Sequence, residues 1–238
     1  MPLRGKQASG LLTQQKMLRA AVKLFLEKGY EGTTTAEIAR AAGMTPSSFF
    51  RAFPSKEALL LELDKRMFSG QFALAEQHST ARDPVLLYAV ETAIQLHIAE
   101  LTEPLRELYV TAYTLPSTSA YLYRSTAKRL EGIFGDYLSD AEAKDFYEME
   151  IASAGMMRSF MAVPCDVYFT VERKIARFLE CALKLYNVPV ERRREVTAAV
   201  LQLDLHAMAA GIIRTTVQQA EKGFEAVKAE PALSLIHI

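Results

Sequence analysis

Histidine, cysteine and acidic side chains carry most of the catalysis and metal binding in proteins, but they form no recognisable motif in this sequence. The four histidines are far apart, and the spacings His-Glu-x-x-His and Glu-x-x-His are both absent. Asp204 and His206 lie two residues apart, so a helix would direct them to different faces. Cys165 and Cys181 are too few for a disulfide framework or a four-ligand zinc site. There is also no Gly-rich phosphate loop. The sequence therefore argues against an enzyme and predicts neither a metal nor a cofactor.

Basic side chains are concentrated at the N-terminal end of the chain. The 28 Lys and Arg residues balance the 28 Asp and Glu residues overall. Residues 1–60 nonetheless hold nine basic and four acidic side chains, a net charge of +5, so residues 61–238 carry −5. This asymmetry is typical of a nucleic-acid-binding domain attached to a second domain, although solvated helix faces can produce it by chance.

The composition is that of a soluble globular protein, with 50% apolar and 24% charged residues over 238 positions. The longest apolar stretch, residues 196–213, is interrupted by polar side chains, so we expect a buried helix there and no membrane span. The N-terminus lacks the apolar segment of a secretory signal. We therefore expect a cytoplasmic protein.

Helix start and stop signals divide the first part of the chain. Gly29 is placed to end a first helix in the left-handed conformation. Thr34 and Glu37 have the spacing of a capping box, and Thr45-Pro46 is a second start signal. The predicted helices are residues 13–28, 34–42, 45–53 and 56–77, and they follow a flexible basic tail over residues 1–10.

The two short helices are separated by a turn of about three residues that contains Gly43, which is the pattern of a helix-turn-helix. Ile38, Phe49 and Phe53 have the spacing to pack these helices against the two longer ones. The sequence therefore predicts a helix-turn-helix domain over residues 1–58.

The rest of the chain predicts a second, entirely helical domain over residues 59–230. Its expected helices are 84–101, 104–115, 119–137, 140–161, 168–186 and 190–222, with prolines near most boundaries. No strand pattern stands out, so we expect an all-α protein. Residues 233–238 look like the translation of a sequencing adapter, and we exclude them from the fold as a suspected non-native tail.

The segment from Met17 to Leu60 resembles the DNA-binding domain of the tetracycline-repressor (TetR) family. The resemblance rests on these residues: Ala20, Ala21, Phe25, Gly29, Tyr30, Thr34, Ile38, Ala39, Ala42, Gly43, Thr45, Phe49, Phe50, Phe53 and Ser55 to Leu59. It implies a regulator that binds double-stranded operator DNA as a homodimer, and a helical domain that binds a small-molecule effector. Release of the DNA on effector binding would make the protein a repressor.

The same resemblance implies a set of DNA-contacting residues. Thr34, Lys56 and the position held by Phe50 would contact phosphates. The residues on or beside the recognition helix would be Thr45, Pro46, Ser47, Ser48 and Arg51. Arg51 is the only residue of that helix able to bind guanine through two hydrogen bonds.

Two positions depart from the family pattern, which usually has Tyr at Phe50 and His at Ala52. Base specificity would then depend more on Arg51, Ser47 and the basic tail. Each residue also has a simpler interpretation. In this interpretation Thr34 and Thr45 are helix caps without a role in DNA binding. Phe50 is a core residue, and Arg51 is a solvated surface residue.

The helical domain contains two further groups of candidate residues. The helix over 196–213 is apolar nearly all round, so it must be covered on more than one side. By resemblance to the family, the predicted dimer interface is Phe178, Val200, Leu201, Leu205, Met208 and Ile212; the alternative is the central helix of a monomer. A dimer would place its recognition helices roughly 34–36 Å apart, which matches a palindromic operator.

The middle helices are rich in aromatic residues and methionine, which favours a pocket for a small apolar or aromatic molecule. Candidate lining residues are His97, Tyr109, Tyr113, Met156 and Phe160, although such residues are more often ordinary core. The second functional hypothesis is a helical protein–protein adaptor with a degenerate DNA-binding head. Salt-dependent binding to duplex DNA distinguishes the two functions.

Overall fold

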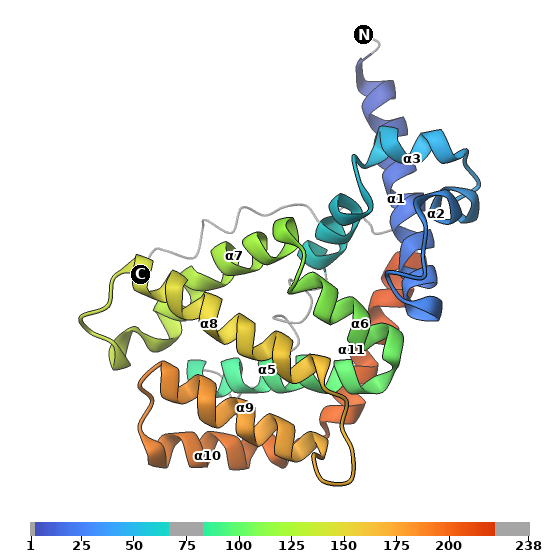
Figure 1. The fold of residues 1–238 in the computed structure, drawn as a ribbon. Helices are drawn as coiled ribbons and strands as arrows, with labels where there is room; N and C mark the ends of the chain where they lie inside the picture. The colour runs from blue at the N-terminus through green and yellow to red at the C-terminus, as the bar shows by residue number, and fades with distance from the viewer. Residues whose placement is uncertain (1–2, 67–82, 222–238) are drawn as a thin grey trace.

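The computed structural model describes residues 3–66 and 83–221, and every regular element within these ranges is a helix. We call α1, α2, α3 and the helical segment 56–66 the head, and α5 to α11 the body (Figure 1). The bounds are α1 Leu3–Lys28, α2 Thr35–Ala41, α3 Pro46–Ala52, α5 Pro84–Leu101, α6 Glu103–Ala112, α7 Pro116–Phe134, η1 Gly135–Tyr137, α8 Ala143–Ala162, α9 Val171–Leu185, α10 Val190–Leu201 and α11 Leu205–Glu221. The predicted all-α class is confirmed. Residues 67–77 of the predicted long helix and the suspected tail 233–238 lie outside the described ranges.

The predicted start and stop signals of the head are present as hydrogen bonds and dihedral angles. The Thr34 hydroxyl accepts from the Glu37 N–H at 3.2 Å, and the Glu37 carboxylate accepts from the Thr34 N–H at 2.8 Å. Gly29 and Gly43 have φ values of +77° and +73°, which end α1 and α2 in the left-handed region. The capping box and both glycine stops are therefore confirmed.

Two expectations about the head are wrong. α1 begins at Leu3, so residues 3–10 are helical and not a flexible tail. Extending an existing helix fixes one residue for each new hydrogen bond, which is much less costly than starting one. Thr45 precedes α3, but its hydroxyl makes no hydrogen bond to the backbone of the first turn.

The predicted helix 190–222 is two helices, α10 and α11, which meet at an angle of 66°. Asp204 causes the new start, because its Oδ1 accepts from the Ala207 N–H at 2.9 Å. The bend turns the apolar faces of both helices onto α5. Among the described helices, none is long and apolar enough by itself to cross a membrane, although α10 and α11 taken together have the length and composition.

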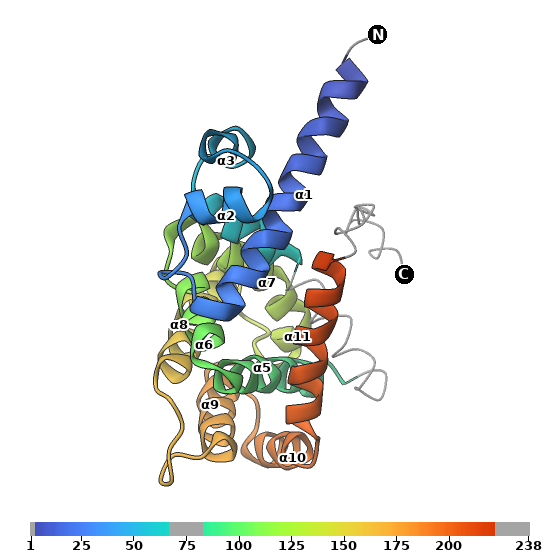
Figure 2. The same cartoon turned by 90° about the vertical axis from the view of Figure 1, so that its right-hand side faces the viewer.

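One apolar cluster organises the head. Phe25 from α1, Ile38 from α2 and Phe49 from α3 are all fully buried in it. The cluster continues into Leu108 on α6 and Ala220 on α11. Figure 2 shows α11 rising beside α1, so the head is packed directly on the body.

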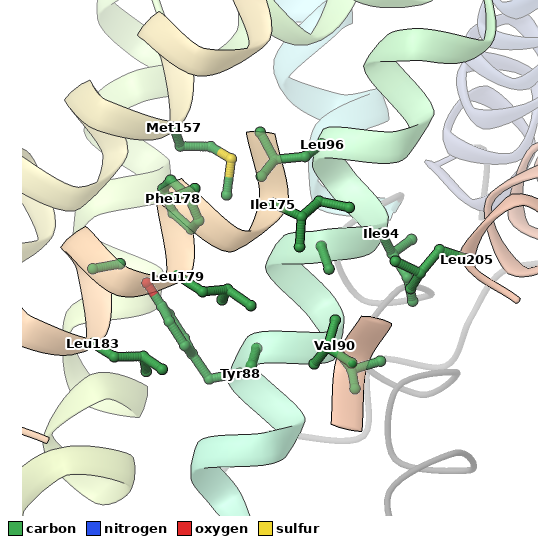
Figure 3. Close-up of a cluster of buried hydrophobic side chains, with 14 of the residues drawn as sticks. Tyr88, Val90, Ile94, Leu96, Met157, Ile175, Phe178, Leu179, Leu183 and Leu205 are labelled. Atoms are coloured by element: carbon green, nitrogen blue, oxygen red, sulfur yellow. The ribbon is translucent and has the colours of Figure 1, made fainter. Parts of the chain in front are cut away.

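The body is built around α5, which contacts each of the other α-helices of the body. Tyr88, Val90, Ile94 and Leu96 extend from different sides of α5 toward these neighbours (Figure 3). A helix covered on several sides can be apolar on several sides, which explains its continuous apolar sequence.

A buried ion pair joins α9 to the end of α5. Lys174 is fully buried, and its Nζ lies 2.5 Å from Glu100 Oε1 and also donates to the Val163 carbonyl. Glu100 Oε2 accepts from the Cys165 N–H at 3.1 Å. Burial opposes ionisation of Glu100, but the hydrogen bonds from Lys174 and Cys165 outweigh it and lower the pKa of this carboxyl. The pair therefore holds the α8–α9 loop against α5.

Replacing Glu100 with Gln should lower the free energy of unfolding by about 3–5 kcal/mol, because it leaves the Lys174 charge buried without its counter-charge. Urea denaturation of Glu100→Gln at neutral pH measures this loss. The double variant Glu100→Gln/Lys174→Met should recover most of it, since the fully buried charge of Lys174 is removed and only the more exposed Arg106, which also pairs with Glu100, loses its partner. Because folding lowers the pKa of Glu100, the stabilisation is present at neutral pH and is lost on acidification. A loss below about 1 kcal/mol, as for surface ion pairs, would contradict this assignment.

Candidate nucleic-acid interface

The outer face of α3 carries the exposed residues predicted for the recognition helix. α3 lies on the side of the head that is away from the body (Figures 1 and 2). The exposed residues on or beside it are Thr45, Pro46, Ser47, Phe50 and Arg51. Phe50 is 60% exposed, whereas the neighbouring Phe49 is fully buried. Phe50 is thus not a core residue, and α3 presents an apolar ring beside a guanidinium.

Ser48 lies on the inner side of α3, in contrast to the prediction. It is 9% exposed, and its Oγ accepts from Arg51 Nη2 at 3.0 Å. The Thr45 hydroxyl lies 2.9 Å from Ser48 Oγ and 3.0 Å from Ser47 Oγ. The three hydroxyls thus form hydrogen bonds with one another, and that of Ser48 orients Arg51. Ser48 therefore has a positioning role and does not face outward.

Thr34 and Lys56, the other predicted phosphate contacts, make hydrogen bonds inside the head. The Thr34 hydroxyl donates to the Glu37 carboxylate at 2.8 Å. Lys56 Nζ donates to the carbonyls of Tyr30 at 2.8 Å and Thr33 at 3.0 Å, and it lies 4.0 Å from the Tyr30 ring centroid. Lys56 therefore connects the segment 56–66 to the α1–α2 turn.

Glu37 also pairs with Lys28, whose Nζ lies 2.5 Å from Glu37 Oε1. The hydrogen bonds from Lys28 and Thr34 lower the pKa of Glu37 to about 2. The positive end of α2 is therefore already balanced by a carboxylate of its own first turn. Arg40, in the last turn of α2, is exposed and was missed as a candidate, although a basic residue at the end of the first short helix could have indicated it.

The predicted dimer interface is wrong at four of its six positions. The following residues are at most 8% exposed and belong to the core of their own chain: Phe178, Val200, Leu205 and Ile212. Leu201 and Met208 are half-buried. The break at Asp204 explains the difference, because two shorter helices can each turn an apolar face inward where one straight helix could not.

The body contains a small cavity of about 40 Å³. This is room for about three water molecules. It is lined by α5, α7, α8 and α9 together with Tyr113, which follows α6. Of the five predicted pocket residues only Tyr113 lines it. Tyr109 is buried elsewhere in the core, while Met156 and Phe160 are half-buried against that core.

Met157 lines the cavity instead of Met156, because consecutive helical residues point about 100° apart. His97 is half-buried between α5 and α11, with its Nε2 3.4 Å from His206 Nδ1. Burial and the neighbouring His206 lower the pKa of His97.

The cavity is more polar than the sequence suggested. Glu91 on α5 is buried, and its Oε2 accepts from Arg129 Nη2 at 3.1 Å. Gln95 donates to Glu91 Oε1 at 3.5 Å and accepts from the Tyr113 hydroxyl at 2.7 Å. Burial raises the pKa of Glu91 to about 7, although Arg129 acts against this.

A second buried carboxyl, that of Glu150 on α8, also lines the cavity. Its Oε2 accepts from Ser153 Oγ at 2.8 Å, and Ser153 accepts from the Tyr186 hydroxyl at 2.8 Å. Burial raises the pKa of Glu150 to about 8, and Glu91 adds to the shift. A purely apolar ligand would leave both carboxyls without a suitable partner.

Two carboxylates connect the head to α7, which lines the cavity, and to α6, which precedes the cavity residue Tyr113. Glu107 on α6 accepts from the Glu31 N–H at 2.6 Å. Glu57, at the start of the segment 56–66, accepts from the Ser117 N–H at 2.7 Å and from the Ser117 hydroxyl. Ser117 is in the first turn of α7, which carries Arg129 further along. These hydrogen bonds join α6 and α7 directly to the head.

Comparison with known proteins agrees with this architecture. Residues 17–63 match the model of the bacterial regulatory proteins of the tetR family. The chain is 47% identical over 73 residues to the HTH-type transcriptional regulator TcmR of Streptomyces glaucescens, covering 31% of this chain and 32% of TcmR. It is 33% identical over 92 residues to AcrR of Shigella flexneri, covering 38% of this chain and 41% of AcrR. The matches span about a third of the length of the first of these curated relatives.

A comparison of folds with solved structures extends to the body. The crystal structure of RolR in complex with resorcinol superposes with a TM-score of 0.64 at 17% identity, over 80% of this chain and 95% of RolR. At this identity the similarity concerns the fold. The head therefore contains a segment that matches the tetR family model, and the body shares the helical fold of RolR.

Proposed function

We propose that the protein is a DNA-binding transcriptional regulator, which acts as a repressor and is released from a palindromic operator by a small molecule in the body cavity. The observation that carries this proposal is the outer face of α3, where Ser47, Phe50 and Arg51 are exposed on a head with a net positive charge. An α-helix with short polar residues fits the major groove of duplex DNA.

Each exposed side chain of α3 has a chemical role in this proposal. Arg51, oriented by Ser48, donates two hydrogen bonds to the O6 and N7 atoms of a guanine. Phe50 offers an apolar surface to a thymine methyl group, in place of the hydroxyl that a tyrosine would direct to a phosphate. Ser47 allows close approach, and Arg40 adds positive charge beside the helix.

A homodimer is part of the proposal because two recognition helices read a palindromic site together. Within the predicted interface, Leu201 and Met208 keep exposed surface and lie close to the α10–α11 bend. The interface that we propose is therefore formed by the outer faces of α10 and α11 and not by their buried faces.

The effector acts through the helices that line the cavity. Tyr113 follows α6 and Arg129 is on α7, and these two helices hold the head through Glu107 and Ser117. The complex of RolR with resorcinol supports a small-molecule site in a body of this fold. Occupation of the cavity needs to bias the head by only about 1–3 kcal/mol to change operator affinity 5–150-fold.

Arg51→Ala should weaken binding to the selected operator by about 1–3 kcal/mol, because it removes a two-bond contact with guanine. The operator is first selected from a pool of random duplexes, and affinity is then measured by fluorescence anisotropy at fixed salt. The matched control is Arg124→Ala, which removes an exposed arginine from α7 of the body and should leave affinity unchanged. Equal losses for the two variants, or no salt-dependent binding to any duplex, would count against a recognition role for α3 and favour the adaptor hypothesis.

Glu57→Gln should weaken the response of DNA binding to an effector, because it removes the carboxylate that holds Ser117. A molecule that releases the operator from the unaltered protein is first found by screening. Its effect on operator affinity should fall by about tenfold, or 1.4 kcal/mol, in Glu57→Gln, while its own affinity for the protein is retained. The control is Glu62→Gln, which is on the same helix. Within the described residues, the ion pair of Glu62 is with Arg66, four residues further along that helix. An unchanged response in Glu57→Gln shows that this contact does not carry the coupling.

A further inference from the structure

The cavity contains more acidic than basic side chains. Glu91, Glu150 and Arg129 all line it, and both acidic residues are only 6% exposed. Arg129 lies 3.1 Å from Glu91 and forms an ion pair with it. Among the described residues, Glu150 forms no ion pair, and its side chain accepts only from the Ser153 hydroxyl. Ionised Glu150 therefore needs a counter-charge that these residues do not provide.

The walls around Glu150 suit a small aromatic or aliphatic body. Tyr88, Tyr113, Met157 and Phe178 line the same cavity. Figure 3 shows Tyr88, Met157 and Phe178 close together, from α5, α8 and α9 respectively. Aromatic faces attract cations, and the thioether of methionine adapts to irregular shapes. The cavity volume of about 40 Å³ is below the roughly 150 Å³ of a cavity that holds benzene, so a ring enters only if the surrounding helices move apart.

We propose that the effector is a compact organic cation, with a protonated amine against Glu150 and a small ring between the aromatic walls. The inference deepens the proposed function and rests on it, since it names the class of molecule that the cavity accepts. With such a ligand the site holds two ion pairs, Glu91 with Arg129 and Glu150 with the amine. Every buried charge then has a counter-charge.

Other classes of ligand satisfy the cavity less well. A carboxylate or phosphate would add a negative charge beside Glu150 and Glu91 and would face only Arg129, which is already paired. A neutral hydroxyl compound could form a hydrogen bond with Glu150, but it brings no counter-charge and would therefore not favour the ionised form of this buried carboxyl. An apolar compound would provide no donor to either carboxyl.

The test uses three probes that share one ring and differ in the attached group: benzylamine, benzyl alcohol and benzoate. Isothermal titration calorimetry on the full chain at neutral pH measures their affinities. We expect benzylamine to bind about tenfold more tightly than benzyl alcohol, a difference of 1.4 kcal/mol, and benzoate not to bind. The proposal is overturned if benzyl alcohol or benzoate binds the unaltered protein as tightly as benzylamine or more tightly. It is also overturned if none of the three probes binds.

Glu150→Gln keeps the shape of the side chain and removes its charge. It should lower the affinity for benzylamine by about tenfold and change that for benzyl alcohol by less than about threefold. The matched control is Glu148→Gln, an exposed carboxylate on the same helix, which should change neither affinity. If Glu150→Gln still prefers benzylamine to the same degree, Glu150 is not the counter-charge.

A pH series adds a readout that packing alone would not change. The charged or titratable groups around Glu150 are Glu91 and Tyr88 on α5, Arg129 on α7, Tyr113 after α6 and Tyr186 after α9. Because the pKa of free Glu150 is raised to about 8, benzylamine affinity should increase from about pH 6 to about pH 8 as this carboxyl ionises. Benzyl alcohol affinity should not increase. A flat benzylamine profile contradicts the proposal.

These measurements contain no DNA, so they separate the ligand class from the proposed function. If benzylamine shows the expected preference but does not change the anisotropy of a bound operator, the ligand class stands and the effector role of the cavity fails. If DNA is released by compounds whose binding does not depend on Glu150, the regulator stands and the cation proposal fails.

Discussion

Burial of Phe49 is the constraint on which the presentation of α3 depends. Phe49 packs with Phe25 and Ile38 in the apolar cluster of the head, and all three side chains are fully buried. Successive residues of a helix point about 100° apart. With Ser48 and Phe49 both facing inward, Phe50 and Arg51 are left on the side of α3 that faces solvent. The hydrophobic effect thus orients the polar surface of α3 without any specific contact to DNA.

The same cluster prevents the head from being an independent unit. Leu108 and Ala220 of the body complete it, and the carboxylates of Glu57 and Glu107 hydrogen-bond across the boundary between head and body. All four residues belong to α6, α11 or the first turn of the segment 56–66. A change in the packing of these elements therefore reaches α3 through contacts that are already in place.

The polar cavity lies within a core that is otherwise apolar. Burying Glu91 and Glu150 is costly, and their raised pKa values reflect that cost. Such groups are better explained by a ligand that pairs with them than by stability, because apolar side chains of similar size would stabilise the fold at least as well. In contrast, the buried pair of Lys174 and Glu100 is satisfied within the chain and has a structural role.

The sequence alone determined where α2 begins and where α1 and α2 end, because caps and stops act within a few residues: the Thr34–Glu37 box, Gly29 and Gly43 form as predicted. It also determined the exposure of Arg51 through helical periodicity. Only the tertiary structure decided that Lys56 binds carbonyls within the head, that Val200 and Leu205 face their own core, and that Glu91 and Glu150 share a cavity. These outcomes depend on which helix faces meet across long sequence separations, and that information is not contained in local spacing.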